Sequence, residues 1–150
     1  MKRFIGCVLL ALHTLTGWAA THEMPLRLPD TIAPTAYRLA IQLDPNLPTH
    51  SGEVAISVDI KQSARLIRLH AVDITVQSAV LRVGTRTFTA SAHQRSTDLL
   101  DLNFDKAFPI GQGELTIAFA GKIEDKDSQG LFRQQEGGDW YAFTQFESIS

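Results

Sequence analysis

The chain has 150 residues, of which 44% are hydrophobic and 20% are charged, and its formal net charge is −2. This profile is typical of one globular domain that is large enough to bury a core. A charge close to zero, without clustered Lys and Arg, provides no electrostatic basis for binding nucleic acid, so no nucleic-acid partner is expected.

The N-terminal residues predict a secretory signal peptide. The chain starts with the basic "MKR", continues with an apolar stretch that is too short to span a bilayer, and then reaches the small residues of "GWAA". This pattern indicates a signal at residues 1–19, with cleavage after Ala19 or Ala20. The alternative, a buried N-terminal helix, must accommodate His13 inside the apolar stretch. We therefore expect a periplasmic or secreted protein with no stable membrane span after the signal is removed.

Cys7 is the one cysteine of the sequence, and it lies inside the predicted signal. The mature chain would therefore contain no cysteine, no disulfide and no cysteine nucleophile. Its stability must come from its core or from further chain.

Residues 20–150 alternate with a period of two, which predicts one all-β domain. The clearest alternation runs over residues 37–43 and 54–60, with the loop "DPNLPTHSG" between them and a turn at Ser51 and Gly52. These two runs are predicted to form a hairpin or two neighbouring strands. Further strands are predicted at residues 66–69, 74–83, 87–90, 99–104, 115–119, 130–134 and 140–146.

Eight or nine short strands without a convincing helix predict an antiparallel β-sandwich or an open sheet. Turn sequences separate several of the strands, notably "VGTR", "FPIGQG" and "EGGD". The aromatic residues Trp140, Tyr141, Phe143 and Phe146 are predicted to pack in the core or against the sheet. Arg133 is predicted to lie at the edge of a strand.

Residues 20–150 contain no recognisable catalytic or metal-binding motif. Four histidines, His22, His50, His70 and His93, lie far apart in the sequence, and there is no HExxH. Each is expected at the surface or at a strand end. Neither a GxSxG sequence nor a phosphate-binding glycine loop occurs. No catalytic residue and no metal ligand is therefore assigned to this chain.

The segment "DKDSQGLFRQQE" has the spacing of a calcium-binding EF-hand loop. Asp125, Asp127, Gln129, Gly130 and Glu136 would take its ligand and glycine positions. However, Gln replaces an expected acidic ligand, an arginine adds positive charge, and the flanking segments alternate like strands. The preferred interpretation is a charged, solvated turn, with the calcium loop as the alternative.

Four segments follow one another in a specific order: "PTAYRLAIQLDPNLPTHSGEVAISVDI", "IRLHAVDITV", "GELTIAFAGKIEDKDSQGLFRQ" and "WYAFTQFES". This ordered set, over about residues 26–149, resembles the N-terminal domain of the aminopeptidase N family, the zinc-dependent gluzincin aminopeptidases. The resemblance implies that residues 20–150 form a β domain with a saddle-like sheet or sandwich. It also implies that this domain is incomplete at its C-terminal end, because the catalytic part of family members lies further along the chain.

The resemblance implies a substrate-binding residue as well. In the family, a Thr-Gln-x-Glu element contributes the residue that binds the free amino group of the substrate, and Thr144-Gln145-Phe146-Glu147 matches it. Glu147 is therefore the predicted substrate-binding residue, with Gln145 and Phe146 as secondary candidates beside it. A free α-amino group is largely cationic at neutral pH, so a carboxylate in a partly dry pocket offers it a charge-assisted hydrogen bond.

In family members, zinc held by HExxH and a downstream Glu activates the water that hydrolyses the peptide. The resemblance thus implies an exported zinc aminopeptidase that acts on peptide N-termini, in which this chain anchors the substrate and a missing catalytic domain holds the zinc. This chain alone is expected to bind no catalytic zinc and to be inactive. Stopping at Ser150 is expected to leave an unpaired strand edge and exposed apolar side chains.

A function of a different class remains open. A secreted β-sandwich of this size can be a binding module for a carbohydrate or a protein, or an interaction domain that shares the scaffold without catalysis. Exposed aromatic side chains on one face would favour this alternative.

Overall fold

The computed structural model describes Leu28 and residues 30–145, and this part of the chain is all β. Nine strands and no helix occur among these residues, which confirms the predicted class and strand number. It follows that the described chain has no helix long and apolar enough to cross a membrane. The signal predicted at residues 1–19 lies outside the described residues. The strands are β1 (Ile32–Leu43), β2 (Thr49–Ile60), β3 (Ala64–His70), β4 (Ile74–Val83), β5 (Arg86–Gln94), β6 (Leu99–Phe108), β7 (Gly111–Lys122), β8 (Gly130–Glu136) and β9 (Asp139–Gln145).

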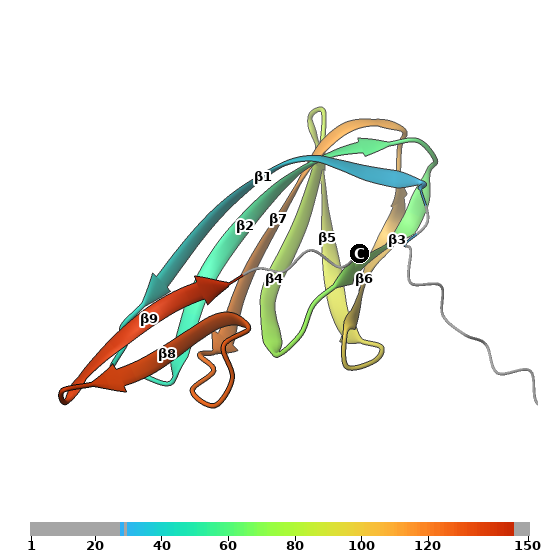
Figure 1. Ribbon diagram of the computed structural model, residues 1–150. Coiled ribbons are helices and arrows are strands. Elements are labelled where there is room, and N and C mark those ends of the chain that lie inside the picture. The colour runs from blue at the N-terminus through green and yellow to red at the C-terminus, as the bar shows by residue number, and fades with distance from the viewer. Residues whose placement is uncertain (1–27, 29, 146–150) are drawn as a thin grey trace, which may run out of the picture.

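Seven strands form one antiparallel sheet that curls into a half-barrel (Figure 1). Of the two predicted forms, a β-sandwich and a saddle-like sheet, the structure has the second. The strand order is β1-β2-β7-β4-β5-β6-β3, so β7 lies between two strands that precede it in the chain. The edges are β1 and β3. The start of β1 is held to the end of β2 because the N–H of Lys61 donates to the carbonyl of Thr31 at 2.9 Å.

The predicted hairpin of the first two strands is confirmed, but its turn lies earlier in the chain than expected. Asp44 closes this turn: its Oδ1 accepts a hydrogen bond from the N–H of Asn46 at 3.0 Å, and its carbonyl accepts one from the N–H of Leu47 at 2.9 Å. An Asp side chain that accepts a bond from the backbone two residues on is a common turn device. Ser51 and Gly52, which were predicted at the turn, lie inside β2.

Gly52 has a packing role in β2. A Cβ atom at this position would lie 2.6 Å from the carbonyl oxygen of Ala40 and 2.8 Å from Cζ of Phe119. Glycine inside a strand often marks such a close approach. Glycine is therefore required at this position by the ring of Phe119 on the neighbouring strand. The prediction of a turn was wrong because it interpreted this glycine as a site of chain reversal.

Side chains on one face of the large sheet form the core. Strand pairing places Ile56, Leu115 and Leu81 opposite one another on β2, β7 and β4, and the last two are fully buried. Burying a side chain of this size stabilises the fold by about 1.5–3 kcal/mol. The buried cluster consists of Ile56, Val58, Ile60, Ile67, Ala79, Leu81, Val83, Leu100, Leu102, Phe104, Phe108, Leu115 and Ile117.

The same apolar face is uncovered along β1. Tyr37 pairs with Ile56 and Leu39 with Val54, so both continue the core face onto the edge strand, yet they are 65% and 52% exposed. A groove of about 810 Å³, lined mainly by apolar side chains of β1, β2 and β3, adjoins this region. In the described structure, β1 thus presents both an apolar surface and an unpaired strand edge.

The opposite edge strand, β3, is fixed to β6 by a charged pair with little exposure. Arg68 donates from Nε to Oδ1 of Asp101 at 2.6 Å and from Nη2 to Oδ2 at 3.0 Å, and Arg95 lies 3.6 Å from the second oxygen. Asp101 is 6% exposed. The hydrogen bond from Arg68 holds the pKa of Asp101 below its usual value, although burial opposes this shift.

The last two strands form a separate two-stranded sheet beside the large one (Figure 1). Gly137 and Gly138 make its turn with φ angles of 60° and 98°, which favour glycine. A parallel bridge between Glu124 and Phe132 connects this hairpin to the segment that follows β7.

We predict that Leu115→Ala lowers the free energy of unfolding by about 2–5 kcal/mol, because it removes a fully buried side chain at the centre of the sheet. Urea denaturation followed by circular dichroism measures this loss. Thr89→Ala, at an exposed position of β5, is the control and should change the free energy by less than about 1 kcal/mol. Equal losses in the two variants would contradict the assignment of the core.

A second prediction concerns acid stability. Because the folded pKa of Asp101 lies below the ordinary 3.8, its ionised form stabilises the fold above that value, and the contribution disappears as the pH falls through the folded pKa. Asp101→Asn should therefore cost about 1–3 kcal/mol at neutral pH. The difference from the unmodified chain should shrink below about pH 4, as measured by urea denaturation at a series of pH values. A difference that stays constant down to the acid limit would count against the ion pair.

Candidate functional site

The predicted substrate-binding element begins at the end of β9. Gln145 is the last residue of this strand and pairs with Gly130, the first residue of β8. Thr144, one residue earlier, pairs with Leu131. Phe146 and Glu147 lie outside the described residues, so their roles stay predictions, as does that of Gln145. The described half of the element thus lies at the end of the hairpin that is remote from its turn.

The hairpin has two different faces. Tyr141, Phe143 and Gln145 share one face, because alternate residues of a strand point the same way. Tyr141 is 49% exposed and Phe143 is 46% exposed, although the latter stacks on Phe132 with ring centroids 5.5 Å apart. The prediction that these aromatic residues pack internally is therefore wrong for Tyr141 and holds for Phe143 only through its contact with Phe132.

Arg133 lies on the other face of the hairpin, in an edge strand as predicted because this sheet has only two strands, but its side chain is buried. Its side chain is only 9% exposed. The guanidinium carbon lies over the ring of Trp140, 4.2 Å from the centroid. Nη1 donates to the carbonyl of Pro45 at 3.1 Å, and Nη2 lies 3.6 Å from a carboxylate oxygen of Asp125. One side chain therefore contacts the β1–β2 turn, the β7–β8 loop and β9.

Backbone hydrogen bonds reinforce this junction. The N–H of Arg133 donates to the carbonyl of Glu124 at 2.7 Å, and the N–H of Glu124 donates to the carbonyl of Leu131 at 3.2 Å. The N–H of Ile123 donates to the carbonyl of Pro48 at 2.9 Å. The hairpin is thus connected to the end of β7 and, through it, to the β1–β2 turn. Arg133 and Trp140 lie diagonally opposite each other on β8 and β9. The sequence shows both residues, but their contact can be predicted only when the pairing of the two strands is known.

The residues of the candidate calcium loop do not converge. Glu136 ends the seven-residue strand that starts at Gly130, so the two lie roughly 20 Å apart at about 3.3 Å per residue. Asp125 faces Arg133, and Asp127 accepts a hydrogen bond from the next backbone N–H. No group of three His, Cys, Asp or Glu in the described chain is arranged to hold a metal ion. The structure therefore favours the solvated turn.

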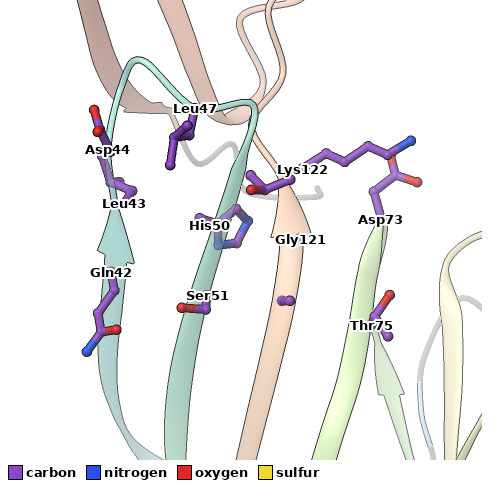
Figure 2. A pocket seen from close by; sticks show the side chains of 12 residues that line it. Gln42, Leu43, Asp44, Leu47, His50, Ser51, Asp73, Thr75, Gly121 and Lys122 are labelled. Atoms are coloured by element: carbon purple, nitrogen blue, oxygen red, sulfur yellow. The ribbon is translucent and has the colours of Figure 1, made fainter.

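A pocket of about 700 Å³ lies beside the β1–β2 turn, at the edge of the sheet where β1 and β7 end and β2 and β4 begin (Figure 2). Its wall includes the acidic residues Asp44 and Asp73, the basic Lys122, and His50, which stands on β2 beside Gly121 of β7. The hydrogen bonds from Asn46 lower the pKa of Asp44. The pocket is open and mixes both charge signs, so it has no evident preference for a ligand of one charge.

His50 confirms the prediction of a strand-end histidine, but it is half-buried. Its ring packs edge-on against Phe119 with centroids 6.0 Å apart, and its Nδ1 is buried without a hydrogen-bond partner among the described atoms. Burial lowers the pKa of this imidazole below 6.5, which keeps the ring neutral at pH 7. A neutral ring held by packing indicates a structural role. The remaining histidines behave as expected or lie outside the described residues: His70 and His93 are exposed, and His22 is not described.

Comparison with known proteins adds a family. Residues 33–150 match the sequence model of the Peptidase M1 N-terminal domain. Aminopeptidase M1-D of Oryza sativa subsp. japonica is 32% identical over 136 residues, which cover 87% of this chain and 15% of that protein. Aminopeptidase M1-C of the same organism is 30% identical over 127 residues, with coverage of 82% and 14%. Aminopeptidase M1 of Arabidopsis thaliana is 31% identical over 136 residues, with coverage of 81% and 15%. The chain thus spans about a seventh of the length of these relatives.

We predict that Gly121→Ala displaces the ring of His50, because the new Cβ would lie 2.5 Å from Nε2. As the ring becomes more exposed, the pKa of His50 should rise toward 6.5. The substitution should also cost about 1–3 kcal/mol of stability. Titration of the imidazole by NMR measures the pKa, and the signals of His70 and His93 should keep their original chemical shifts. An unaltered titration of His50 in the variant would show that the ring is not confined by Gly121.

Proposed function

This chain belongs to the peptidase M1 family through its N-terminal domain, and on that premise we propose that it is the substrate-anchoring domain of an exported zinc metallo-aminopeptidase. The complete enzyme removes N-terminal amino acids from peptides, and this domain binds the free amino group of the substrate. The observation that carries the proposal is the continuous family match from residue 33 to residue 150, which includes the Thr-Gln-x-Glu element. Its relatives are aminopeptidases, which supports a peptide substrate.

Glu147 is the proposed anchoring residue. Its carboxylate accepts a charge-assisted hydrogen bond from the substrate ammonium group, and such bonds are about twice as strong as bonds between neutral groups. Fixing the amine at one point also fixes which peptide bond reaches the catalytic centre. Release of a single residue from the N-terminus then follows from the geometry of binding.

Gln145 and Phe146 are proposed to border the same site. Gln145 lies on the side of β9 that also carries Tyr141 and Phe143, because alternate residues of a strand point the same way. Phe146 is proposed to restrict water around the carboxylate, which strengthens its interaction with a cation.

Zinc is assigned to the catalytic part of the longer polypeptide. The described residues of this chain offer no ligand set for it, so no step of hydrolysis is routed through them. When bound in the complete enzyme, zinc supplies an activated water. Export to the periplasm or the cell exterior is proposed from the basic start and the short apolar stretch of residues 1–19.

A non-catalytic secreted binding module is the second candidate. It is favoured by the exposed aromatic side chains of Tyr37, Tyr141 and Phe143. The DNA that follows codon 150 separates the two functions. An open frame that continues into an HExxH sequence supports the peptidase, whereas a stop codon at that place supports the binding module.

In the full-length enzyme, Glu147→Ala should raise KM and lower kcat/KM for substrates with a free N-terminus. The loss of the charge-assisted contact should cost about 2–4 kcal/mol of transition-state stabilisation. Steady-state kinetics with aminoacyl 4-nitroanilides measure both constants. Glu136→Ala, at the exposed turn of the same hairpin, is the matched control and should leave kcat/KM unchanged. An unchanged kcat/KM for Glu147→Ala would remove this residue from the site.

A further inference from the structure

The β8–β9 hairpin has to be oriented by its junction with the rest of the domain. A two-stranded sheet is only marginally stable by itself, so its direction depends on what holds it. The contacts that connect it to the rest of the domain include the backbone bridge around Glu124 and Phe132 and those of the Arg133 side chain. The first fixes the hairpin along one line, and a second point of attachment is needed to fix its tilt.

The Arg133 side chain has the geometry of such an attachment. Its planar guanidinium uses one terminal nitrogen on the carbonyl of Pro45 and the other toward Asp125, while its flat face covers Trp140. Bonds in the plane and stacking across it constrain the group in all directions. Because the side chain is 9% exposed, water competes little for these contacts.

The attachment lies close to the predicted amine-binding end of β9 and on its opposite face. Arg133 pairs with Ala142, three residues before Gln145, which corresponds to about 10 Å along the strand. Arg133 and Trp140 occupy the back of the hairpin, whereas Tyr141, Phe143 and Gln145 occupy the front. The Arg133 contacts thus hold the hairpin from behind, and on the front face Tyr141 and Phe143 are exposed whereas Phe132 is buried.

A small change in tilt at this point has a large effect at the end of the strand. A pivot of about 10° moves an atom that is about 10 Å away by nearly 2 Å. Misplacement of a binding group by about 1 Å can reduce a rate by about 100-fold. The orientation of the junction therefore matters for a residue that must meet a substrate amine.

We propose that Arg133 is a positioning residue, which holds the β8–β9 hairpin so that the Gln145 end of β9 is directed at the α-amino group of the substrate. This inference rests on the proposed function. Arg133 itself does not touch the substrate. It acts through its contacts with Pro45, Asp125 and Trp140.

The test uses two ligands that differ only in the amino group, L-leucinol and 4-methylpentan-1-ol, with the full-length enzyme. Their inhibition constants are measured as competitors of an aminoacyl 4-nitroanilide, and their ratio reports the preference for the amine. Arg133→Met, which keeps an apolar contact with Trp140, should reduce this preference by about 10-fold or more. Arg133→Lys should not restore it, because one ammonium group cannot form the planar fork and the stacking contact together. Arg38→Met is the control: Arg38 makes an exposed ion pair with Glu114 on the large sheet, so the ratio should not change.

The outcomes separate this inference from the function on which it rests. Absence of an amine preference in the unmodified enzyme, or an unchanged preference in Glu147→Ala, overturns the proposed function. If Glu147→Ala abolishes the preference but both Arg133 variants weaken the two ligands equally, Arg133 is merely structural and the inference fails. If the inference holds, adding Arg133→Met to Glu147→Ala causes no further loss of preference, because both changes remove the same interaction. Arg133→Lys, the milder change, decides the question if Arg133→Met does not fold.

Discussion

The placement of β7 between β2 and β4 is the constraint on which the rest of the domain depends. β7 pairs with β2 from Thr49 to Ile60 and with β4 from Ile74 to Val83, so it supplies hydrogen bonds to both halves of the large sheet. Its inward side chains Leu115 and Ile117 lie at the centre of the core. Because β7 follows β6 in the chain, the sheet is complete only when distant segments have come together, a topology associated with slow folding. The end of β7 then leads directly into the junction with the hairpin.

The β2–β7 ladder also shows how this sheet accommodates bulky side chains near the first turn. Gly52 lies opposite Phe119, and two residues away Gly121 lies opposite His50. Each glycine leaves space for the ring on the other strand, since a Cβ on either one would approach that ring within 3 Å. This reciprocal arrangement of glycines and rings places Phe119 and His50 edge to face and buries Nδ1 of His50. The lowered pKa of His50 is thus a consequence of packing between two strands, and it provides no sign of catalysis.

Period-two alternation was sufficient to predict eight or nine strands and the pairing of the first two, because strands at the centre of the large sheet bury one face and expose the other. It could not predict the strand order, since alternation says nothing about which strands are neighbours. Ser51 and Gly52 were predicted in a turn because the sequence does not show whether a glycine permits a bend of the chain or a close approach of a neighbouring side chain. The burial of Arg133 and the exposure of Tyr141 depend on the attachment of the hairpin, which no local pattern contains. The substrate-binding element was predicted from the ordered family segments. The contacts of Arg133 that attach the hairpin were not predicted.

Two guanidinium groups with low exposure hold the outer elements of this domain, and their differences indicate different roles. Arg68 meets Asp101 through two short bonds, so its charge is well compensated and edge strand β3 gains a stable attachment. Arg133 has its carboxylate at 3.6 Å, depends on a carbonyl and a ring, and leaves its Nε buried without a described partner. A buried cation with incomplete compensation costs stability, and an apolar side chain of similar size often serves stability equally well. What an apolar side chain does not provide is direction, because its contacts tolerate rotation whereas a planar fork does not. A buried arginine with incomplete charge compensation is therefore physically reasonable at a junction that is proposed to set the direction of β9. At a junction that only attached the hairpin, it would offer no advantage over an apolar side chain.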